Sequence, residues 1–271
     1  MSDYLLRDDA PFSAEEWAKL DELVVDVARK LLVGRRFIHL TGPLGVGVET
    51  VPVPTVGGEA GESDVIQMAE HRFLSLPLIY QNFRLPWRDI EASRRMGWPL
   101  ELGPAATASA TCARTEDELI FHGHPEHGYE GLLNADGRQT VTLDDWDEPG
   151  QAFANIVAAT EALVADGFYE PFAVVLSPAL YAKTQRVAKG IGRLESKLIK
   201  DVAEGGLFRS PVLAENQGLV VAQGARNFDL VVGQDLITAY LGPEDMDHHF
   251  RVLESLVLRI KRPGAICTLE K

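Results

Sequence analysis

The sequence predicts an α+β fold, because helical and strand-like patterns are mixed along the chain without the regular alternation of βαβ units. Helix-period patterns dominate the earlier part of the chain, and strand-like runs dominate after residue 218. The 271 residues are 46% hydrophobic and 24% charged. This composition is typical of a globular protein with one or two packed domains.

An amphipathic helix is predicted over residues 13–33. Ser13 and Glu16 have the spacing of a capping box, in which each side chain bonds the backbone amide of the other residue. Apolar residues then recur at helical spacing, with charged residues between them: Trp17, Leu20, Val24, Val27, Ala28 and Leu31.

A long hairpin arm is predicted over residues 48–86. Strand-like runs at 48–53 and 73–83 flank residues 57–64, which are rich in glycine and acidic residues and typical of an exposed loop tip. An isolated hairpin buries too little apolar surface to be stable in water. We therefore expect another surface to cover the arm.

A central spine helix is predicted at 104–121, because small residues fill its first half and permit close approach of another element. The other predicted helices are at 87–96, 151–166 and 178–187, and the other predicted strands are at 37–40, 172–176, 219–223, 228–232, 236–241, 250–260 and 265–269.

Charge and cysteine content exclude several classes of protein. The net charge of −14 would repel nucleic acid over most of the surface. The chain has no run of about 18 apolar residues for a bilayer span and no basic and apolar signal segment at its start, so we expect a cytoplasmic protein with no membrane partner. Cys112 and Cys267 have no CxxC partner and are expected to be buried apolar residues.

The chain also lacks the short motifs of phosphate-binding loops, serine hydrolases and zinc peptidases, so we predict that it is not an enzyme. His122, His124 and His127 are the best metal-ligand candidates, because neutral imidazole binds zinc, copper and iron. The glycine and proline among them favour a flexible, solvated loop with no preset geometry. We therefore expect no metal site.

Five segments, in order and spanning essentially the whole chain, resemble the type 1 encapsulin shell family, also called linocin-type bacteriocins. They are LLVGRRFI (31–38), TGPLG (41–45), EDELIFHG (116–123), GYEGLL (128–133) and LVVGQDL (230–236). Each segment alone is a weak signal, whereas five in family order are specific.

The resemblance implies the fold of tailed-bacteriophage major capsid proteins, with a peripheral domain, an axial domain and an extended loop. Identical copies would then close an icosahedral shell of about 60 subunits or a multiple. The implied parts are the N-terminal helix and start of the peripheral domain (1–47), the extended loop (48–86), the peripheral domain with the spine helix (87–134), the axial domain (135–228) and the C-terminal strands that complete the peripheral domain (229–271).

The resemblance further implies a groove on the inner wall that binds a C-terminal targeting peptide of a cargo protein. By position it points to Ala28, Leu31, Leu32, Arg35, His39, Asp235, Leu236 and Ile237. The apolar residues would bury the anchors of the peptide, and Arg35 and Asp235 would fix its backbone. Some relatives have an acidic residue in place of His39, so the preferred peptide would differ.

Two further sites are implied by position. Gly190, Ile191, Gly192 and Arg193 fall where the axial loops of the family surround the five-fold pore. Trp87 lies where some encapsulins stack a flavin, although packing in a core or interface is the stronger expectation for a tryptophan. No other cofactor is expected in the shell.

The function implied by the resemblance is that of a bacterial nanocompartment shell around a ferritin-like iron-storage protein, or around a dye-decolorising peroxidase, in defence against oxidative stress. A phage or prophage major capsid protein is the first alternative, but DNA packaging favours a more basic inner face than this acidic chain offers. A secreted bacteriocin or protease-like enzyme is the second, and it would need a nucleophile with its base or a formed metal site.

Overall fold

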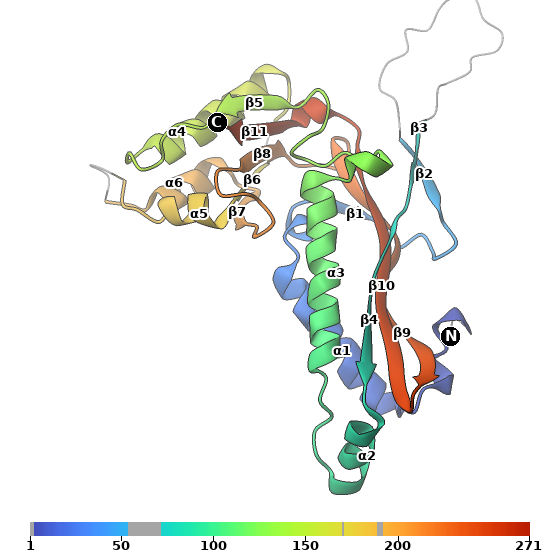
Figure 1. Ribbon diagram of the computed structural model, residues 1–271. Coiled ribbons are helices and arrows are strands. Elements are labelled where there is room, and N and C mark those ends of the chain that lie inside the picture. The colour runs from blue at the N-terminus through green and yellow to red at the C-terminus, as the bar shows by residue number, and fades with distance from the viewer. Residues whose placement is uncertain (1–2, 54–71, 170, 189–191) are drawn as a thin grey trace, which may run out of the picture.

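The computed structural model describes residues 3–53, 72–169, 171–188 and 192–271. Two sheet-based units meet near the C-terminal end of helix α3 (Gly103–His122), as Figure 1 shows. One unit is elongated along α3. The other lies to one side of its upper end and contains the C-terminus.

The elongated unit is a four-stranded sheet packed with helices. Its elements, besides α3, are α1 (Ala14–Leu31), β1 (His39–Thr41), β4 (Leu78–Leu85), α2 (Trp87–Met96), β9 (Phe228–Glu244) and β10 (Asp247–Ile260). The strand order is β1-β9-β10-β4, in which only the β1–β9 pair is parallel. Helix α3 contacts α1, β4 and β10, so it is central to this unit.

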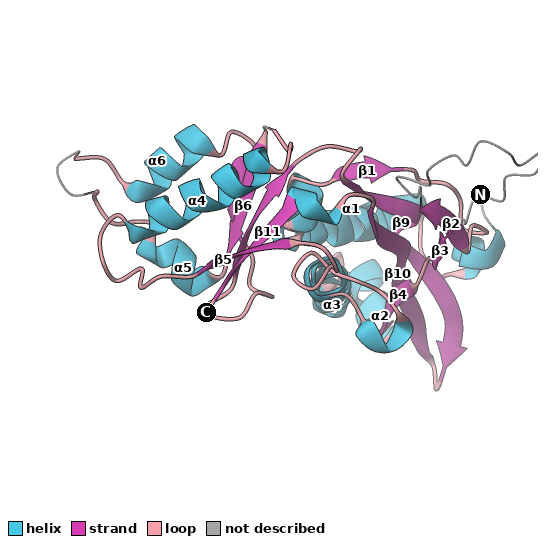
Figure 2. Cartoon of the chain, turned by 90° about the horizontal axis from the view of Figure 1, so that it is seen from above, coloured by secondary structure: helices cyan, strands magenta, loops and turns pink. Residues whose placement is uncertain are grey.

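The second unit is a five-stranded sheet with helices packed against it, as the view from above shows (Figure 2). Its elements are β5 (Gln139–Thr142), α4 (Gln151–Ala165), β6 (Phe172–Leu176), α5 (Pro178–Lys183), α6 (Glu195–Val202), β7 (Gly206–Arg209), β8 (Gly218–Ala222) and β11 (Ile266–Glu270). The strand order is β5-β11-β8-β6-β7. Every residue of β6 and β8 is buried, which explains their continuous apolar sequences.

A separate two-stranded ribbon, β2 (Thr50–Val53) with β3 (Arg72–Ser75), stands beside the elongated unit (Figure 1). Val51 packs on Val231 and Val257 of the four-stranded sheet. The predicted loop tip at 57–64 lies outside the described residues. The predicted strand at 73–83 is two strands, because β4 belongs to the four-stranded sheet and not to the arm.

The predicted capping box at the start of α1 is confirmed. The amide of Glu16 donates to Ser13 Oγ at 3.2 Å, and the amide of Ser13 donates to Glu16 Oε2 at 2.7 Å. The buried face of the helix is Trp17, Leu20, Val24 and Ala28, as its periodicity predicts.

The small residues in the first half of α3 allow α1 to lie against it. Ala105 and Ala108 are buried there, and the hydroxyl of Ser109 donates to the carbonyl of Val24 at 2.6 Å. This arrangement confirms the predicted spine. Helix α3 has 20 residues, but no helix in the described part of the chain is apolar enough over such a length to cross a bilayer.

The strands predicted at 228–232 and 236–241 form one strand, β9, which makes a long hairpin with β10. Asp245 and Met246 form its turn, with φ angles of 50° and 71°. The pairing register shifts around Ser255, and this bulge coincides with the interruption in the apolar pattern at 233–235.

Two features differ from what the sequence predicts: one domain boundary and three short elements. Strand β11 pairs with β5 and β8, so the chain's last strand lies in the second unit and does not complete the first. Strands β5 and β7 and helix α6 were not predicted. Each is short, and β5 alternates between partly buried and exposed residues without enough length to show a period.

Candidate functional site

A buried ion cluster lies where the end of α1, helix α3 and strands β9 and β10 come together. Arg35, in the turn after α1, is its centre. The Arg35 guanidinium donates to Glu116 of α3 at 2.8, 2.8 and 3.0 Å, to Glu254 of β10 at 2.8 Å and to Asp235 of β9 at 2.6 Å. One side chain therefore ties together segments that are far apart in the sequence.

Gly34 and Asp117 bring the end of α1 close to α3. The Asp117 carboxylate accepts hydrogen bonds from the amides of Val33 and Gly34, each at 2.9 Å. A Cβ atom on Gly34 would lie 2.6 Å from Ile120 Cδ1, so the approach requires glycine. Burial, which these hydrogen bonds only partly oppose, raises the pKa of Asp117 to about 6.

Two of the carboxyl groups around Arg35 are shielded from water. The side chains of Glu116 and Glu254 are 0% and 1% exposed, and one guanidinium cannot neutralise both. Desolvation, followed by the charge of Glu116, raises the pKa of Glu254 well above its ordinary value despite the attraction of Arg35. Glu254 is therefore the carboxyl group of the cluster that favours the protonated form.

Asp235 is the exposed end of the cluster, with 59% of its side chain accessible against 16% for Arg35. Partial burial raises the pKa of Asp235, but the hydrogen bond and charge of Arg35 outweigh it and hold the value below the ordinary one. A paired carboxylate and guanidinium thus reach the surface between α1 and β9. Such a pair can bind the polar backbone of a peptide.

The predicted groove residues do not all line one groove. Ala28 and Leu32 are buried and pack with Leu236, so they fasten α1 to β9. Leu31 is exposed and lines a separate hollow of ≈630 Å³ between the end of α1 and β7. His39 is exposed on β1, in register with β9.

Ile237 is covered in part by the chain's own N-terminus. Leu5, in the turn η1 (Asp3–Leu5), packs with Ile237 and Ala239, and the hydroxyl of Tyr4 donates to Gln234 Oε1 at 3.0 Å. No periodic pattern in the first residues predicts this contact. The available signal is a short apolar run, residues 4–6, in front of three charged residues.

The predicted pore segment is described only in part. Gly190 and Ile191 lie outside the described residues. Gly192 has a left-handed φ of 71°, and Arg193 pairs with Asp201 at 2.9 Å. The pore assignment stays a prediction.

Trp87 is the first residue of α2. Its amide donates to Asp247 Oδ1 at 3.4 Å, and the guanidinium carbon of Arg88 lies 5.7 Å from its ring centroid. The ring already has a cation beside it, and flavin stacking there stays a prediction.

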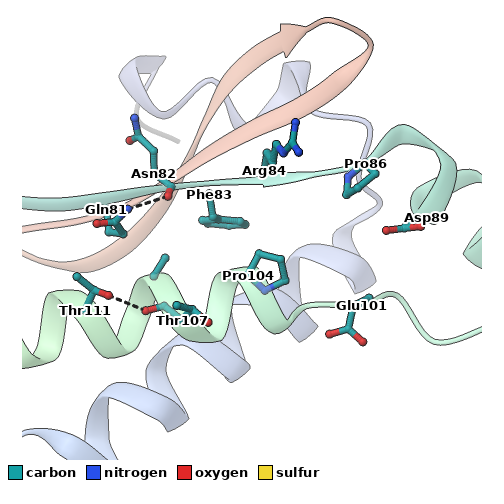
Figure 3. A pocket seen from close by; sticks show the side chains of 11 residues that line it. Gln81, Asn82, Phe83, Arg84, Pro86, Asp89, Glu101, Pro104, Thr107 and Thr111 are labelled. Carbon is teal, nitrogen blue, oxygen red and sulfur yellow. Dashed lines mark hydrogen bonds between the residues drawn. The ribbon is translucent and has the colours of Figure 1, made fainter.

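A hollow of ≈570 Å³ lies between β4 and the first half of α3 (Figure 3). Its polar groups do not converge on a common point. Thr107 and Thr111 turn their hydroxyls back to carbonyls of their own helix, and Arg84 pairs with Asp247. The polar side chains that line the hollow are therefore not arranged to orient one ligand.

The three histidines of the histidine-rich segment do not all come together. His122 Nε2 is bonded to the carbonyl of Val212 at 2.8 Å, away from the others. His124 and His127 come together, with Glu126 beside them, on a backbone with defined turns. His124, Glu126 and His127 are exposed, as the predicted solvated loop requires, and local hydrogen bonds define the turn of its backbone.

Both cysteines are buried and free, as predicted. Burial raises the pKa of the thiol to about 12 for Cys112, where Glu254 adds to the effect, and to about 11 for Cys267. Neither thiol is therefore suited to act as a nucleophile.

The ion cluster as a whole was not predicted. The family resemblance points to Arg35 and Asp235 by position, but it gives Glu116 and Glu254 no role. Three consecutive acidic residues, 116–118, occur in the spine helix, where some of them must face the core. Acidic residues at buried helix positions need partners, and this is the one signal of the ion cluster that the sequence offers.

Comparisons with known proteins agree over the whole chain. The model of the Linocin_M18 family, described as encapsulating protein for peroxidase, matches residues 1–257. The chain is 47% identical to the type 1 encapsulin shell protein EncA of Myxococcus xanthus, over 100% of this chain and 97% of that one. It is 41% identical to a diheme-cytochrome-encapsulin shell fusion protein of Kuenenia stuttgartiensis, over 94% of this chain and 73% of the other.

A ferritin-like-encapsulin shell fusion protein of Pyrococcus furiosus is 25% identical over 81% of this chain and 61% of that protein. Among solved structures, a virus-like particle from Pyrococcus furiosus matches 95% of this chain and 100% of its own, with a TM-score of 0.79 and 23% identity. The capsid of Myoviridae phage XM1 matches 86% of this chain and 88% of its own, with a TM-score of 0.59 and 14% identity. These matches confirm the predicted α+β capsid fold.

Proposed function

The chain belongs to the encapsulin shell protein family, and from this membership we propose that its copies assemble into a closed icosahedral cage around a cargo enzyme. The observation that carries the proposal is the 47% identity to a type 1 encapsulin shell protein over the entire chain. The capsid fold agrees with it, because that fold also builds closed phage shells.

The β2–β3 ribbon supports assembly. It pairs with no other strand among the described residues. Val51 and Val53 of β2 are buried, whereas three of the four residues of β3 are exposed. A two-stranded ribbon is marginally stable in water. We expect a neighbouring subunit to cover it, and a contact of this heterologous kind closes a shell when it is repeated with curvature.

We assign the chemistry to the cargo and not to the shell subunit. The two thiols are buried with raised pKa values, and in the ion cluster the Arg35 guanidinium is already bonded to Glu116, Asp235 and Glu254. We propose a ferritin-like iron-storage protein as the first cargo, in the bacterial cytoplasm, with protection against oxidative stress as the benefit. The ferritin-like fusion relative supports this choice. The family description supports a peroxidase as the second cargo.

We propose that a C-terminal targeting peptide of the cargo docks across Arg35, Asp235 and Ile237. Asp235 and the edge of Arg35 are exposed beside each other, and Ile237, two residues farther along β9, is a half-buried apolar residue that packs with Leu5 and Ala239. Ala28 and Leu32, which are buried, and Leu236, which is partly buried, pack together between α1 and β9.

Cargo loading tests the proposal. The chain is coexpressed with a ferritin-like protein that carries its native tail, and iron and cargo are measured in purified particles. Ile237→Asp should lower cargo per particle at least about tenfold, because a charge replaces an apolar anchor. Leu31→Asp is the matched control, since Leu31 is exposed on the separate hollow beside β7, and it should load normally. Full loading of intact Ile237→Asp particles would contradict the docking surface without contradicting the shell.

A further inference from the structure

We propose that His124, Glu126 and His127 form a binding site for a divalent ion of the late first-row transition metals, such as Cu²⁺, Ni²⁺ or Zn²⁺. The residues lie in and beside the single turn η4 (Pro125–His127), which follows α3. Two imidazole nitrogens and one carboxylate oxygen lie within 4.8 Å of one another. The shell function does not require this site.

The backbone holds the turn in one conformation. His124 and Tyr129 pair through two amide-to-carbonyl hydrogen bonds of 2.8 and 3.1 Å, and the amide of His127 donates to the carbonyl of His124 at 2.9 Å. Pro125 has its φ fixed by its ring, and Gly128 ends the turn in the left-handed region. The two imidazoles therefore project from a closed loop.

The base of this loop is a close crossing of Gly123 and Gly131. A Cβ atom on Gly123 would lie 2.3 Å from the carbonyl oxygen of Tyr129, and one on Gly131 would lie 2.3 Å from the amide nitrogen of Gly123. The Asn134 side chain links the two chain segments of this crossing, since it accepts from the amide of Gly131 and donates to the carbonyl of His122, each at 2.7 Å. Restraint at the base reduces the ordering cost of binding an ion.

The two imidazoles already meet at their Nδ1 atoms, which are 2.9 Å apart. Their ring centroids are 4.3 Å apart and the planes cross at 80°. Without an ion, one ring must donate its Nδ1 proton to the other. Two nitrogens that lie about 2.0–2.1 Å from an ion, at a right angle, would be about 2.9 Å apart. The observed separation therefore suits neighbouring corners of a square-planar or octahedral site.

The site is open to solvent. All three residues are exposed, and the two histidines line a hollow of ≈470 Å³ beside the second half of α3 and β4, with Tyr80 and Leu119 among its other walls. An ion can enter directly, and water fills the remaining coordination positions. His122 takes no part, because its ring is bonded to the carbonyl of Val212.

The ligand set selects the class of metal. Imidazole nitrogen suits copper, nickel and zinc, whereas Mg²⁺ and Ca²⁺ prefer sites made of oxygen ligands. Copper stands highest in the Irving–Williams order and favours tetragonal geometry, which agrees with the 2.9 Å separation of the two nitrogens. We expect Cu²⁺ to bind most tightly and an excess of Mg²⁺ not to displace it.

Equilibrium dialysis of the assembled particle against Cu²⁺ tests the site. The variants are His124→Ala with His127→Ala, Glu126→Gln, and His39→Ala as a control that removes another exposed histidine. We expect the wild type and the His39→Ala control each to bind one more ion per chain than the double variant. Glu126→Gln should hold that ion more weakly, because a neutral amide replaces the carboxylate ligand. The electron paramagnetic resonance spectrum of this additional copper should show hyperfine splitting from two imidazole nitrogens.

Equal copper binding by the wild type and the double variant, in particles of equal size, overturns the site. A spectrum with only one nitrogen also overturns it, because the two rings would not coordinate the same ion. Particle size by light scattering distinguishes a lost ligand from a lost fold.

Discussion

Replacing Glu254 by glutamine should change how the stability of the protein depends on pH. Glu254 is buried beside Glu116, and both contact the single guanidinium of Arg35. Desolvation and the charge of Glu116 raise the pKa of Glu254. Glutamine keeps the carbonyl oxygen that accepts from Arg35 and replaces the other oxygen by a neutral amide, so it mimics the protonated acid.

The magnitude follows from the one proton involved. Above the ordinary pKa of a glutamate, the unfolded chain has released this proton while the native chain retains it. The wild type therefore loses up to about 1.4 kcal/mol of stability per pH unit until the pH reaches the raised pKa. Glutamine does not titrate. Between pH 5 and pH 7 the free energy of unfolding of the wild type should therefore fall by up to about 2.7 kcal/mol relative to that of Glu254→Gln.

Denaturation of assembled particles by guanidinium at pH 5, 6 and 7, followed by tryptophan fluorescence, measures this shift. Glu116→Gln is the contrasting variant, because loss of the two-pronged carboxylate pair with Arg35 should cost about 3–5 kcal/mol across the range. Glu118→Gln is the surface control on the same helix. It loses only the exposed pair with Arg114, and should change stability by less than about 1 kcal/mol.

One result would refute the reasoning. If Glu254→Gln and the wild type differ by the same free energy of unfolding at pH 5 and pH 7, Glu254 is ionised in the native protein. The cluster would then carry both buried carboxylates in charged form.

Further substitutions test the local packing, each by the midpoint of denaturant unfolding. Met246→Gly should stabilise the long hairpin by about 0.5–1 kcal/mol, because it removes a side chain from a left-handed residue; a lower midpoint would contradict this. Gly34→Ala should destabilise the protein by about 1–3 kcal/mol, because the added methyl group clashes with Ile120. Gly47→Ala is the control, since its methyl group meets nothing within 4 Å, and its midpoint should stay close to that of the wild type. Equal midpoints for the two variants would refute the close approach at Gly34. Phe250→Ala should cost about 3–5 kcal/mol, because the ring lies at the centre of an aromatic cluster, and a loss below about 1 kcal/mol would contradict that role.

The long periodic elements could be predicted from the sequence, and the reason is physical. Helix α1 has a capping box and one apolar face, and both signals are local. The same holds for the small-residue half of α3 and for the buried strand β6. Short elements such as β5 and α6 depend on partners distant in the sequence, so local patterns do not reveal them.

The candidate site was predicted only in part, because its geometry depends on long-range pairing. Arg35 and Asp235 were marked by position, and they do contact each other. Leu31 was expected with them, but the turn of the helix directs it to a different hollow. The contribution of Leu5 could not be foreseen, since it requires the N-terminal turn to lie on β9.

Each subunit is expected to leave surface that only identical copies cover. The most direct test is to express the chain without cargo and to measure its mass by sedimentation and its shape by negative-stain electron microscopy. Uniform closed particles of about 60 subunits or a multiple, free of nucleic acid, are the predicted result. A discrete monomer that stays unassembled at high concentration in physiological buffer would contradict the shell function.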